Sequence, residues 1–382
     1  MYRDIHVAPC KCNINVVPCK RNINVVPCKR NINVAPCKRN INVVLCKRNI
    51  NVAPCKRNIN VAVQRNNMPK HIIIDTDPGI DDSLAILLAL ASPEVVLDGI
   101  STIHGNASTA QVTTNALSVL ELAKASHIPV YKGCELPLVQ PSLLAPETHG
   151  EQGIGYAKLS APQTKPQVQK GSDFLIQKIM SSPGEITLVA IGPLTNIALA
   201  IRQEPRIVEN VKEVFIMGGA IRHEGNTTAL AEFNTYVDPH AAHIVFHSGM
   251  PITLTPLDVT YQCIFLPEDL NRLLKINSSI TKFIADATRF YMEFHDEYQR
   301  IDGCVINDPM TLALTFMPEI CDYEELYVDV DISTGVGLGN TFADFYNYEK
   351  KAPNMKVALS VRPRVFMELF LERMEKLAKS IS

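Results

Sequence analysis

The sequence predicts an α/β fold, an open and mainly parallel sheet with helices on both faces, and three observations lead to this prediction. Beyond Met68, short β-branched runs alternate with helical stretches, which is the pattern of βαβ units on a parallel sheet. Polar residues gather directly after several of these runs, where ligands bind in such sheets. The 382 residues are 46% hydrophobic and 20% charged, which allows a sizeable core and excludes a chain that is disordered throughout.

The elements are expected in a regular alternation along the chain. The apolar run His71-Ile-Ile-Ile-Asp75 indicates a buried strand, and a tight Pro-Gly turn separates it from a first helix over 82–91. The later β-branched runs predict strands at 95–103, 186–191, 211–217, 252–257, 326–332, 341–346 and 355–361. Helices are expected at 109–124, 194–202, 239–248, 280–298 and 309–316, with a last helix that runs to Lys379. Together these elements fill one domain of residues 68–382.

Residues 1–67 are a different kind of sequence. From Val7 to Asn60 a nine-residue unit, Val-(Val/Ala)-Pro-Cys-Lys-Arg-Asn-Ile-Asn, is repeated six times with few substitutions. An odd period inverts the facing of each side chain in a strand from one copy to the next, and the recurring Pro blocks a helix. We therefore expect a basic, disordered extension without a core, and a metal- or thiol-reactive tail or a basic targeting peptide are the alternatives.

Charge and cysteine usage exclude several classes of protein. The extension carries 13 basic side chains against one acidic one, whereas the remainder carries 24 basic against 38 acidic ones and is therefore not expected to bind nucleic acid. No run of 18 apolar residues predicts a membrane span, and no secretory signal is recognisable, so a cytoplasmic location is expected. Seven of the 11 cysteines lie in the extension, and six of these recur at intervals of nine, unlike zinc-binding pairs. The other four are expected to be reduced.

An acidic segment follows the first predicted strand. Asp75-Thr-Asp-Pro-Gly-Ile-Asp-Asp82 places four carboxylates within eight residues, and these cannot all stay ionised near one another without a cation. Oxygen ligands without nearby His or Cys favour Ca²⁺ or Mg²⁺ over Zn²⁺. Two alternatives are that Asp81 or Asp82 only caps the helix, or that the loop carries the aspartyl nucleophile of a haloacid-dehalogenase-type phosphatase. Gly79 opposes the second alternative, because those loops have Thr or Val at that position.

The acidic segment resembles the amino-terminal signature of the inosine-uridine-preferring nucleoside hydrolases. Further segments match that family in its order: His104-Gly-Asn106, His149-Gly-Glu-Gln-Gly153, Gly192-Pro-Leu-Thr-Asn196, Met217-Gly-Gly219, Gly225-Asn226 and Ala231-Glu-Phe-Asn234. The resemblance covers residues 68–382 and implies a Rossmann-like nucleoside hydrolase fold, assembled as a homodimer or homotetramer. It also implies Ca²⁺-dependent hydrolysis of the N-glycosidic bond of purine or pyrimidine ribonucleosides, in nucleoside salvage or catabolism.

The resemblance assigns roles to individual residues. Ca²⁺ would be held by Asp77, Asp82, Asp308 and the main-chain carbonyl of Ile191, and Asp77 would take the proton of the attacking water. The residues implied to contact the ribose are Asp81, Asn106, Asn226, Glu232, Asn234 and Asp308. Met217 and Phe233 would pack on the ribose or the base, although core packing is the alternative for both.

One position departs from the family pattern. Asn307 stands where the best-known group has a histidine before the metal-binding aspartate, and an amide cannot supply a proton to the leaving base. His149, His295 and Tyr298 are candidates for that step. On a continuous helix Tyr291, His295 and Tyr298 would share one face. Asn307 also keeps open the alternative of a nucleoside- or ribose-binding homologue with impaired catalysis.

Overall fold

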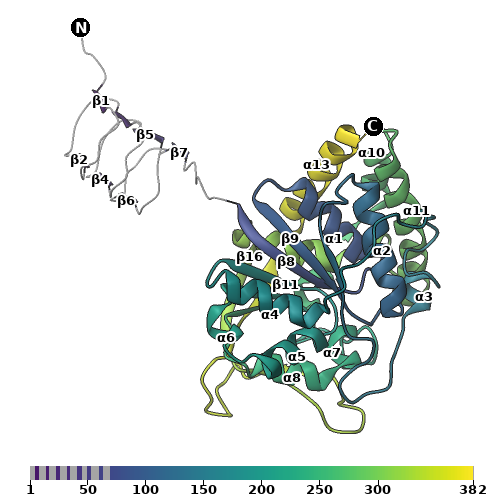
Figure 1. Cartoon of the computed structure of the whole chain (residues 1–382). Coiled ribbons are helices and arrows are strands. Elements are labelled where there is room, and N and C mark those ends of the chain that lie inside the picture. Colours follow the sequence, from purple (N-terminus) through teal and green to yellow (C-terminus); the bar gives the residue numbers. More distant parts are fainter. Residues whose placement is uncertain are drawn as a thin grey trace. The chain divides into compact units, whose positions relative to one another are not determined.

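The computed structural model describes residues 69–381 throughout and, before them, seven short strands. The chain divides into two compact units, Met1–Met68 and Pro69–Ser382 (Figure 1). The strands of the first unit are β1 (Ile5–Val7), β2 (Ile14–Val16), β3 (Ile23–Val25), β4 (Ile32–Val34), β5 (Ile41–Val44), β6 (Ile50–Val52) and β7 (Asn60–Ala62). The remainder of this extension lies outside the described residues, and so does the prediction that it is disordered.

The strands of the extension pair in parallel with every second copy of the repeat. The order is β1-β3-β5-β7 in one sheet and β2-β4-β6 in the other. Ile5 pairs with Ile23, so that partners are two nine-residue periods apart. Partners therefore occupy equivalent positions of the repeat.

The second unit is built on an eight-stranded sheet in the order β10-β9-β8-β11-β12-β13-β19-β16. All neighbours pair in parallel except β16, which is antiparallel to β19. In sheet order the strands are β10 (Val130–Lys132), β9 (Val95–Thr102), β8 (Lys70–Thr76), β11 (Ile186–Ala190), β12 (Glu213–Met217), β13 (Ile252–Thr255), β19 (Met355–Val361) and β16 (Cys321–Leu326). The predicted mainly parallel α/β sheet is therefore confirmed.

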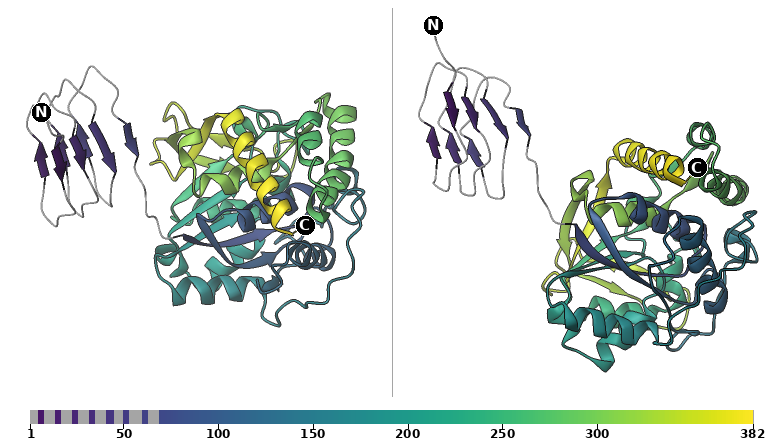
Figure 2. Two further views of the ribbon diagram at one scale, coloured as in Figure 1. Left: turned by 90° about the horizontal axis from the view of Figure 1, so that it is seen from above. Right: turned by 45° about the horizontal axis from the view of Figure 1, so that its top comes forward.

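Helices cover both faces of this sheet (Figure 2). On the central strand β8, Ile72 and Ile74 belong to one hydrophobic core and Ile73 to the other, and all three are fully buried. The longer helices of the first core are α1 (Ile80–Ala91), α2 (Thr109–Leu122), α11 (Ser279–Phe294), α12 (Asn307–Leu314) and α13 (Pro363–Ile381). Those of the second core are α4 (Gly171–Ser181), α5 (Thr195–Gln203) and α8 (Pro239–Phe246). The continuous apolar run of β8 follows from this burial on both faces.

Shorter elements complete the unit. The short helices are α3 (Pro146–His149), α6 (Ile207–Asn210), α7 (Phe233–Val237), α9 (Leu257–Thr260) and α10 (Pro267–Leu273). Strands β14 (Ile264–Phe265) and β15 (Cys304–Val305) form one antiparallel pair, and β17 (Val328–Val330) and β18 (Thr341–Ala343) form another. Among the described helices, none is both long and apolar enough to cross a membrane.

The sequence did not predict the two edges of the sheet. Strand β10 has only three residues, and β16 reads Cys-Asp-Tyr-Glu-Glu-Leu, with a register shift between Asp322 and Tyr323. Edge strands are often short and charged, and this weakens the apolar pattern that marks a buried strand. The run predicted as one strand at 326–332 is split between the end of β16 and β17, which belongs to the separate ribbon.

Candidate active site

A pocket lies at the carboxyl ends of β8, β9, β11 and β12. Segments distant in the sequence meet there because parallel strands present their carboxyl ends at the same edge. The predicted site residues that line the pocket are Asp81, Asn106, His149, Ile191, Met217, Asn226, Glu232, Phe233, Asn234, His295, Asn307 and Asp308. Asp77 and Asp82 are buried beside them rather than in the lining, and Tyr298 lies elsewhere.

Asn106 joins the two buried aspartates to the pocket. Its main-chain N–H donates to Asp77 Oδ2 at 2.7 Å, and its side-chain Nδ2 donates to Asp82 Oδ2 at 2.9 Å. Asp77 Oδ1 has no hydrogen-bond partner among the described residues and is inaccessible to solvent. A Cβ atom on Gly192 would lie 2.5 Å from this oxygen, so the glycine leaves space beside it. An unpartnered buried carboxylate oxygen is costly unless a ligand meets it.

The acidic cluster, defined as Asp77, Asp81, Asp82 and Asp308, concentrates negative charge at the pocket. Carboxylate oxygens of Asp81, Asp82 and Asp308 lie within 4.8 Å of one another and could hold a metal ion. This group contains Asp81, which was expected on the ribose, and does not contain Asp77, which was expected on the metal.

The pKa values of the acidic cluster are raised for the same physical reason. Burial, followed by the nearby Asp81, raises the pKa of Asp82 to about 6. Burial together with the other acidic side chains raises the pKa values of Asp77 and Asp308 well above the ordinary range. A divalent cation would remove this penalty by stabilising the ionised forms, so the oxygen-rich set fits a hard cation.

The loop before α7 is held by Glu232. Its carboxylate caps the helix, accepting from the N–H groups of Asn234 at 2.9 Å and Thr235 at 3.0 Å. Asn234 Nδ2 in turn donates to the main-chain carbonyls of Ile191 at 3.3 Å and Met217 at 3.2 Å. One glutamate and one amide therefore tie this loop to the ends of β11 and β12. The loop thus places a carboxylate and an amide in the pocket at fixed positions.

Aromatic side chains also line the pocket. We call these residues the aromatic wall, and they are Tyr261, Tyr291, Phe294 and His295. Tyr291 donates its hydroxyl to Asp81 Oδ2 at 3.4 Å, and Asn307 Nδ2 donates to the same oxygen at 3.1 Å. The sequence did not identify Tyr261 as a pocket residue. Tyr291 was recognised only by its helical spacing from His295, which is the signal that could have placed it here.

The two pocket histidines are uncharged at neutral pH. Burial lowers the pKa values of His149 and His295 to about 4. His149 Nδ1 accepts from the Ile80 N–H at 3.2 Å, which assigns its proton to Nε2. His295 Nδ1 lies 2.8 Å from the Tyr291 carbonyl oxygen, and its Nε2 accepts from the Val305 N–H at 3.4 Å. Both ring nitrogens of His295 are therefore engaged by the main chain.

The expectation that Tyr291, His295 and Tyr298 share one face is wrong, because the helix changes its pitch. After α11 the chain continues as a π-helix over His295–Gln299, which rotates the following side chains away from α-helical positions. Tyr298 is 65% exposed and stacks on Phe294 with ring centroids 5.1 Å apart. It lines the wider outer opening rather than the pocket.

The fold and the site define an α/β enzyme whose acidic, amide-rich pocket suits a polyhydroxylated ligand beside a hard cation. The sequence profile of the inosine-uridine preferring nucleoside hydrolases matches residues 72–368, and the chain belongs to this family. It is accordingly an N-glycosyl hydrolase that acts on ribonucleosides.

Relatives of known name differ in the base that they prefer. The chain is 38% identical to the inosine-uridine preferring nucleoside hydrolase of Crithidia fasciculata, over 81% of this chain and 99% of that one. It is 37% identical to a pyrimidine-specific ribonucleoside hydrolase of Shewanella, over 80% and 96% of the two chains. Its structure matches the purine-preferring ribonucleoside hydrolase of Gardnerella vaginalis with a TM-score of 0.78 and 32% identity, over 81% and 100%. Family membership thus leaves the base preference open.

Proposed function

We propose that the chain hydrolyses the N-glycosidic bond of purine or pyrimidine ribonucleosides to ribose and free base, in a Ca²⁺-dependent reaction of nucleoside salvage or catabolism. The observation that supports this proposal most directly is the acidic cluster, in which four buried carboxylates meet at one pocket. Among the described lining residues there is no lysine or arginine to neutralise them. A cation and a sugar that develops positive charge are the partners that such a pocket favours.

The proposed ligands of the cation are Asp77, Asp82, Asp308 and the main-chain carbonyl of Ile191. Asp82 and Asp308 belong to the group of oxygens that lie close together, and Asp77 contributes the buried oxygen that lacks a partner. Asp81 is assigned to the ribose instead, because its Oδ2 already accepts from two side chains. A bound divalent cation would polarise a water molecule and lower its pKa.

Asp77 is proposed to take the proton of the attacking water. Burial and the neighbouring carboxylates raise the pKa of the Asp77 carboxylate, and a raised pKa makes a carboxylate a stronger base. The main-chain N–H of Asn106 holds Oδ2 and thereby orients this carboxylate beside the water that the cation would bind, from which it is proposed to take the proton.

The ribose is proposed to lie against carboxylates and amides that accept or donate to its hydroxyls. N-glycoside cleavage builds positive charge on the sugar ring, and nearby carboxylates stabilise that charge. The side chains proposed for this role are Asp81, Asn106, Asn226, Glu232, Asn234 and Asp308. Met217 and Phe233, which also line the pocket, are proposed to pack on the ribose or the base.

The leaving base is proposed to receive its hydrogen bond from His149. This residue lines the pocket and carries its proton on Nε2, whereas the proton of His295 is donated to a main-chain carbonyl. Tyr298 remains a candidate only through movement of the π-helix, because its side chain lies at the outer opening. The hydrogen bond of Asn307 to Asp81 supports a positioning role for that amide.

A second function, a nucleoside- or ribose-binding homologue with impaired catalysis, is favoured by Asn307 alone. The experiment that separates the two functions is a measurement of ribose release from inosine, uridine, cytidine and adenosine by the full chain. Release of ribose and free base in equal amounts is expected from at least one of them. Binding of a nucleoside without any release would favour the second function and overturn the first.

Two further properties are part of the proposal. We expect a homodimer or homotetramer, and light scattering coupled to size-exclusion chromatography would measure the mass of the assembly. A measured mass equal to that of one chain would contradict this expectation. We also expect a cytoplasmic location, and the four described cysteines, Cys134, Cys263, Cys304 and Cys321, are free, as is usual there. A fluorescent fusion of the full chain would test the location.

A further inference from the structure

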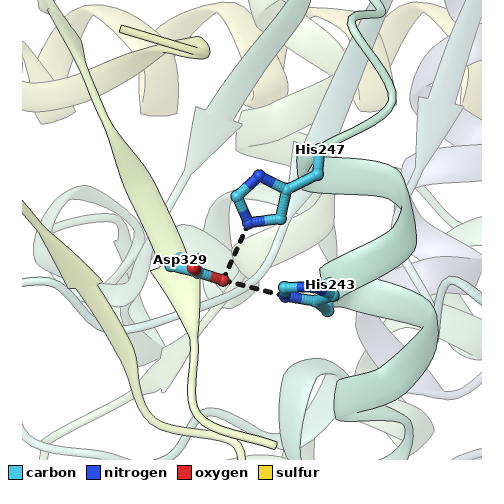
Figure 3. A group of neighbouring side chains, drawn as sticks. All are labelled: His243, His247 and Asp329. Carbon is cyan, nitrogen blue, oxygen red and sulfur yellow. Dashed lines mark hydrogen bonds and ion pairs between the residues drawn. The ribbon is translucent and has the colours of Figure 1, made fainter. Parts of the chain in front are cut away.

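Two histidines and an aspartate form a cluster away from the pocket, where α8 meets the ribbon of β17 and β18. His243 lies in the last turn of α8 and His247 is the residue that caps its end, four positions later and hence on the same side. Asp329 lies in β17. Figure 3 shows both imidazole rings directed towards the carboxylate of Asp329. We propose that this histidine cluster, His243, His247 and Asp329, binds a divalent transition-metal ion of the zinc type.

The distances within the histidine cluster are close to those of a metal site. Asp329 Oδ1 lies 3.0 Å from His243 Nδ1 and 2.9 Å from His247 Nε2, and the three atoms lie within 4.8 Å of one another. In a tetrahedral zinc site with bonds of about 2.0–2.1 Å, neighbouring ligand atoms are roughly 3.3 Å apart. For the two nitrogen–oxygen pairs, an ion therefore requires a separation of only a few tenths of an ångström.

The chemistry of the ligands selects a different ion from that of the pocket. Two imidazole nitrogens and one carboxylate oxygen form a set that zinc and its neighbours in the first transition series bind well. Calcium prefers oxygen ligands alone, which is the chemistry of the acidic cluster. The side chains of His243, His247 and Asp329 are 40%, 31% and 17% exposed, which leaves access for a water molecule as a fourth ligand.

The carboxylate of Asp329 is held in place by a second set of contacts. Its Oδ1 accepts from the Val330 N–H at 2.8 Å, and its Oδ2 accepts from the Tyr327 hydroxyl at 2.9 Å. Tyr327 is itself fixed by Lys351, whose Nζ donates to the phenolic oxygen at 2.7 Å. Hydrogen bonds of this kind orient metal ligands and strengthen binding. The carboxylate of Asp329 is thus already oriented, and only the two imidazole rings need to move to accept an ion.

An ion in the histidine cluster would join two segments that both lead to the pocket. Helix α8 follows α7, whose cap Glu232 lines the pocket, and Thr235 in α7 donates its hydroxyl to the Gly339 carbonyl in the turn between β17 and β18. The ion would therefore cross-link α8 to β17 and stabilise the folded state by its binding free energy.

The test is a titration of the full chain with Zn²⁺ by calorimetry and with Co²⁺ by visible absorption. Accessible thiols are first blocked with iodoacetamide, because the extension contains seven cysteines, and excess Ca²⁺ is present to occupy the acidic cluster. The variants are His247→Gln and Asp329→Asn. His71→Gln is the matched control, because His71 forms the separate surface pair with Asp98 at 3.0 Å.

The wild type and His71→Gln are expected to bind one Zn²⁺ per chain with a rise in Tm. Both cluster variants should bind at least about 10- to 100-fold more weakly and lose that rise. No Zn²⁺ binding by the wild type, or equal binding by the wild type and both cluster variants, would overturn the proposal. If one cluster variant fails to fold, the other variant and the wild-type Co²⁺ spectrum still decide the question. Bands of a nitrogen-ligated tetrahedral ion would support the proposal, and their absence would overturn it.

Discussion

The acidic cluster and the aromatic wall face the same pocket but are built differently. In the acidic cluster, Asp77 lies in the turn after β8, and main-chain amides fix Asp77 and Asp82. The other members lie in the first turns of helices, Asp81 and Asp82 in α1 and Asp308 in α12. The aromatic wall comes from α11, the π-helix after it and α9, and its contact with the acidic cluster is a 3.4 Å bond from Tyr291 to Asp81. The comparison indicates that main-chain hydrogen bonds close to the central strands fix the acidic cluster, whereas the position of the aromatic wall depends on the packing of helices at the periphery of the sheet.

The largest effect is expected from Asp77→Asn, which keeps the shape of the side chain and removes the proposed base. The rate of ribose release should fall on the order of 10²- to 10⁴-fold, because general-base catalysis is lost. Steady-state kinetics on the best nucleoside would measure it. Asp173→Asn, at an exposed position of α4, is the matched control and should leave the rate unchanged. Equal rates for the wild type and Asp77→Asn would show that the acidic cluster does not supply the base.

Protein stability should respond to pH at the acidic cluster in a defined direction. Burial raises the pKa of Asp82 from 3.8 to about 6 and that of the neighbouring Asp75 to about 7. The folded state then holds protons that the unfolded state has released, so the calcium-free protein should lose stability as pH rises from about 4 to 7. For Asp82 this amounts to on the order of 3 kcal/mol.

Thermal unfolding at pH 5 and pH 8, with and without Ca²⁺, measures this effect. Ca²⁺ should raise Tm more at pH 8 than at pH 5, because the cation stabilises the ionised carboxylates. A Ca²⁺ effect of the same size at both pH values would contradict the account of the acidic cluster.

A smaller gain is expected from Asn307→His, which puts a titratable group beside Asp81. If protonation of the leaving base limits the reaction, turnover of inosine should rise roughly 10-fold, below the full range of general-acid catalysis. The pH profile of kcat should gain a limb from the new histidine. An unchanged rate and profile would show that His149 or another donor already suffices.

The smallest effect is expected from Tyr298→Ala at the outer opening. Its side chain is 65% exposed and contacts Phe294 rather than the pocket, so kcat should stay within about 2-fold of the wild type. A loss of 100-fold would show instead that the π-helix carries Tyr298 into the pocket during the reaction. Rates with purine and pyrimidine nucleosides, compared side by side, would reveal any change in base preference.

The sequence predicted the acidic cluster better than the aromatic wall for a physical reason. Asp77 lies on the turn after a buried strand, and Asp81 and Asp82 lie in the first turn of the helix that follows, so the local pattern alone places them together. The prediction that Tyr291 and Tyr298 share one face was wrong, because nothing in the residue spacing marks the switch from α-helix to π-helix. Tyr261 reaches the pocket only through the packing of α9, which is a tertiary property.

The histidine cluster also could not be predicted from the sequence alone. His243 and His247 have the four-residue spacing of helical metal ligands, but their partner Asp329 is more than 80 residues away. Only the fold of the β17 and β18 ribbon brings that carboxylate to the end of α8.

Calcium reconstitution of ribose release tests the central claim most directly. The full chain is stripped with a chelator, and ribose release is followed as Ca²⁺ is added back in the presence of a nucleoside that the untreated protein hydrolyses. The account predicts that the stripped protein is inactive and that one Ca²⁺ per chain restores the rate. Full activity of the stripped protein, confirmed free of metal, would contradict the role assigned to the acidic cluster.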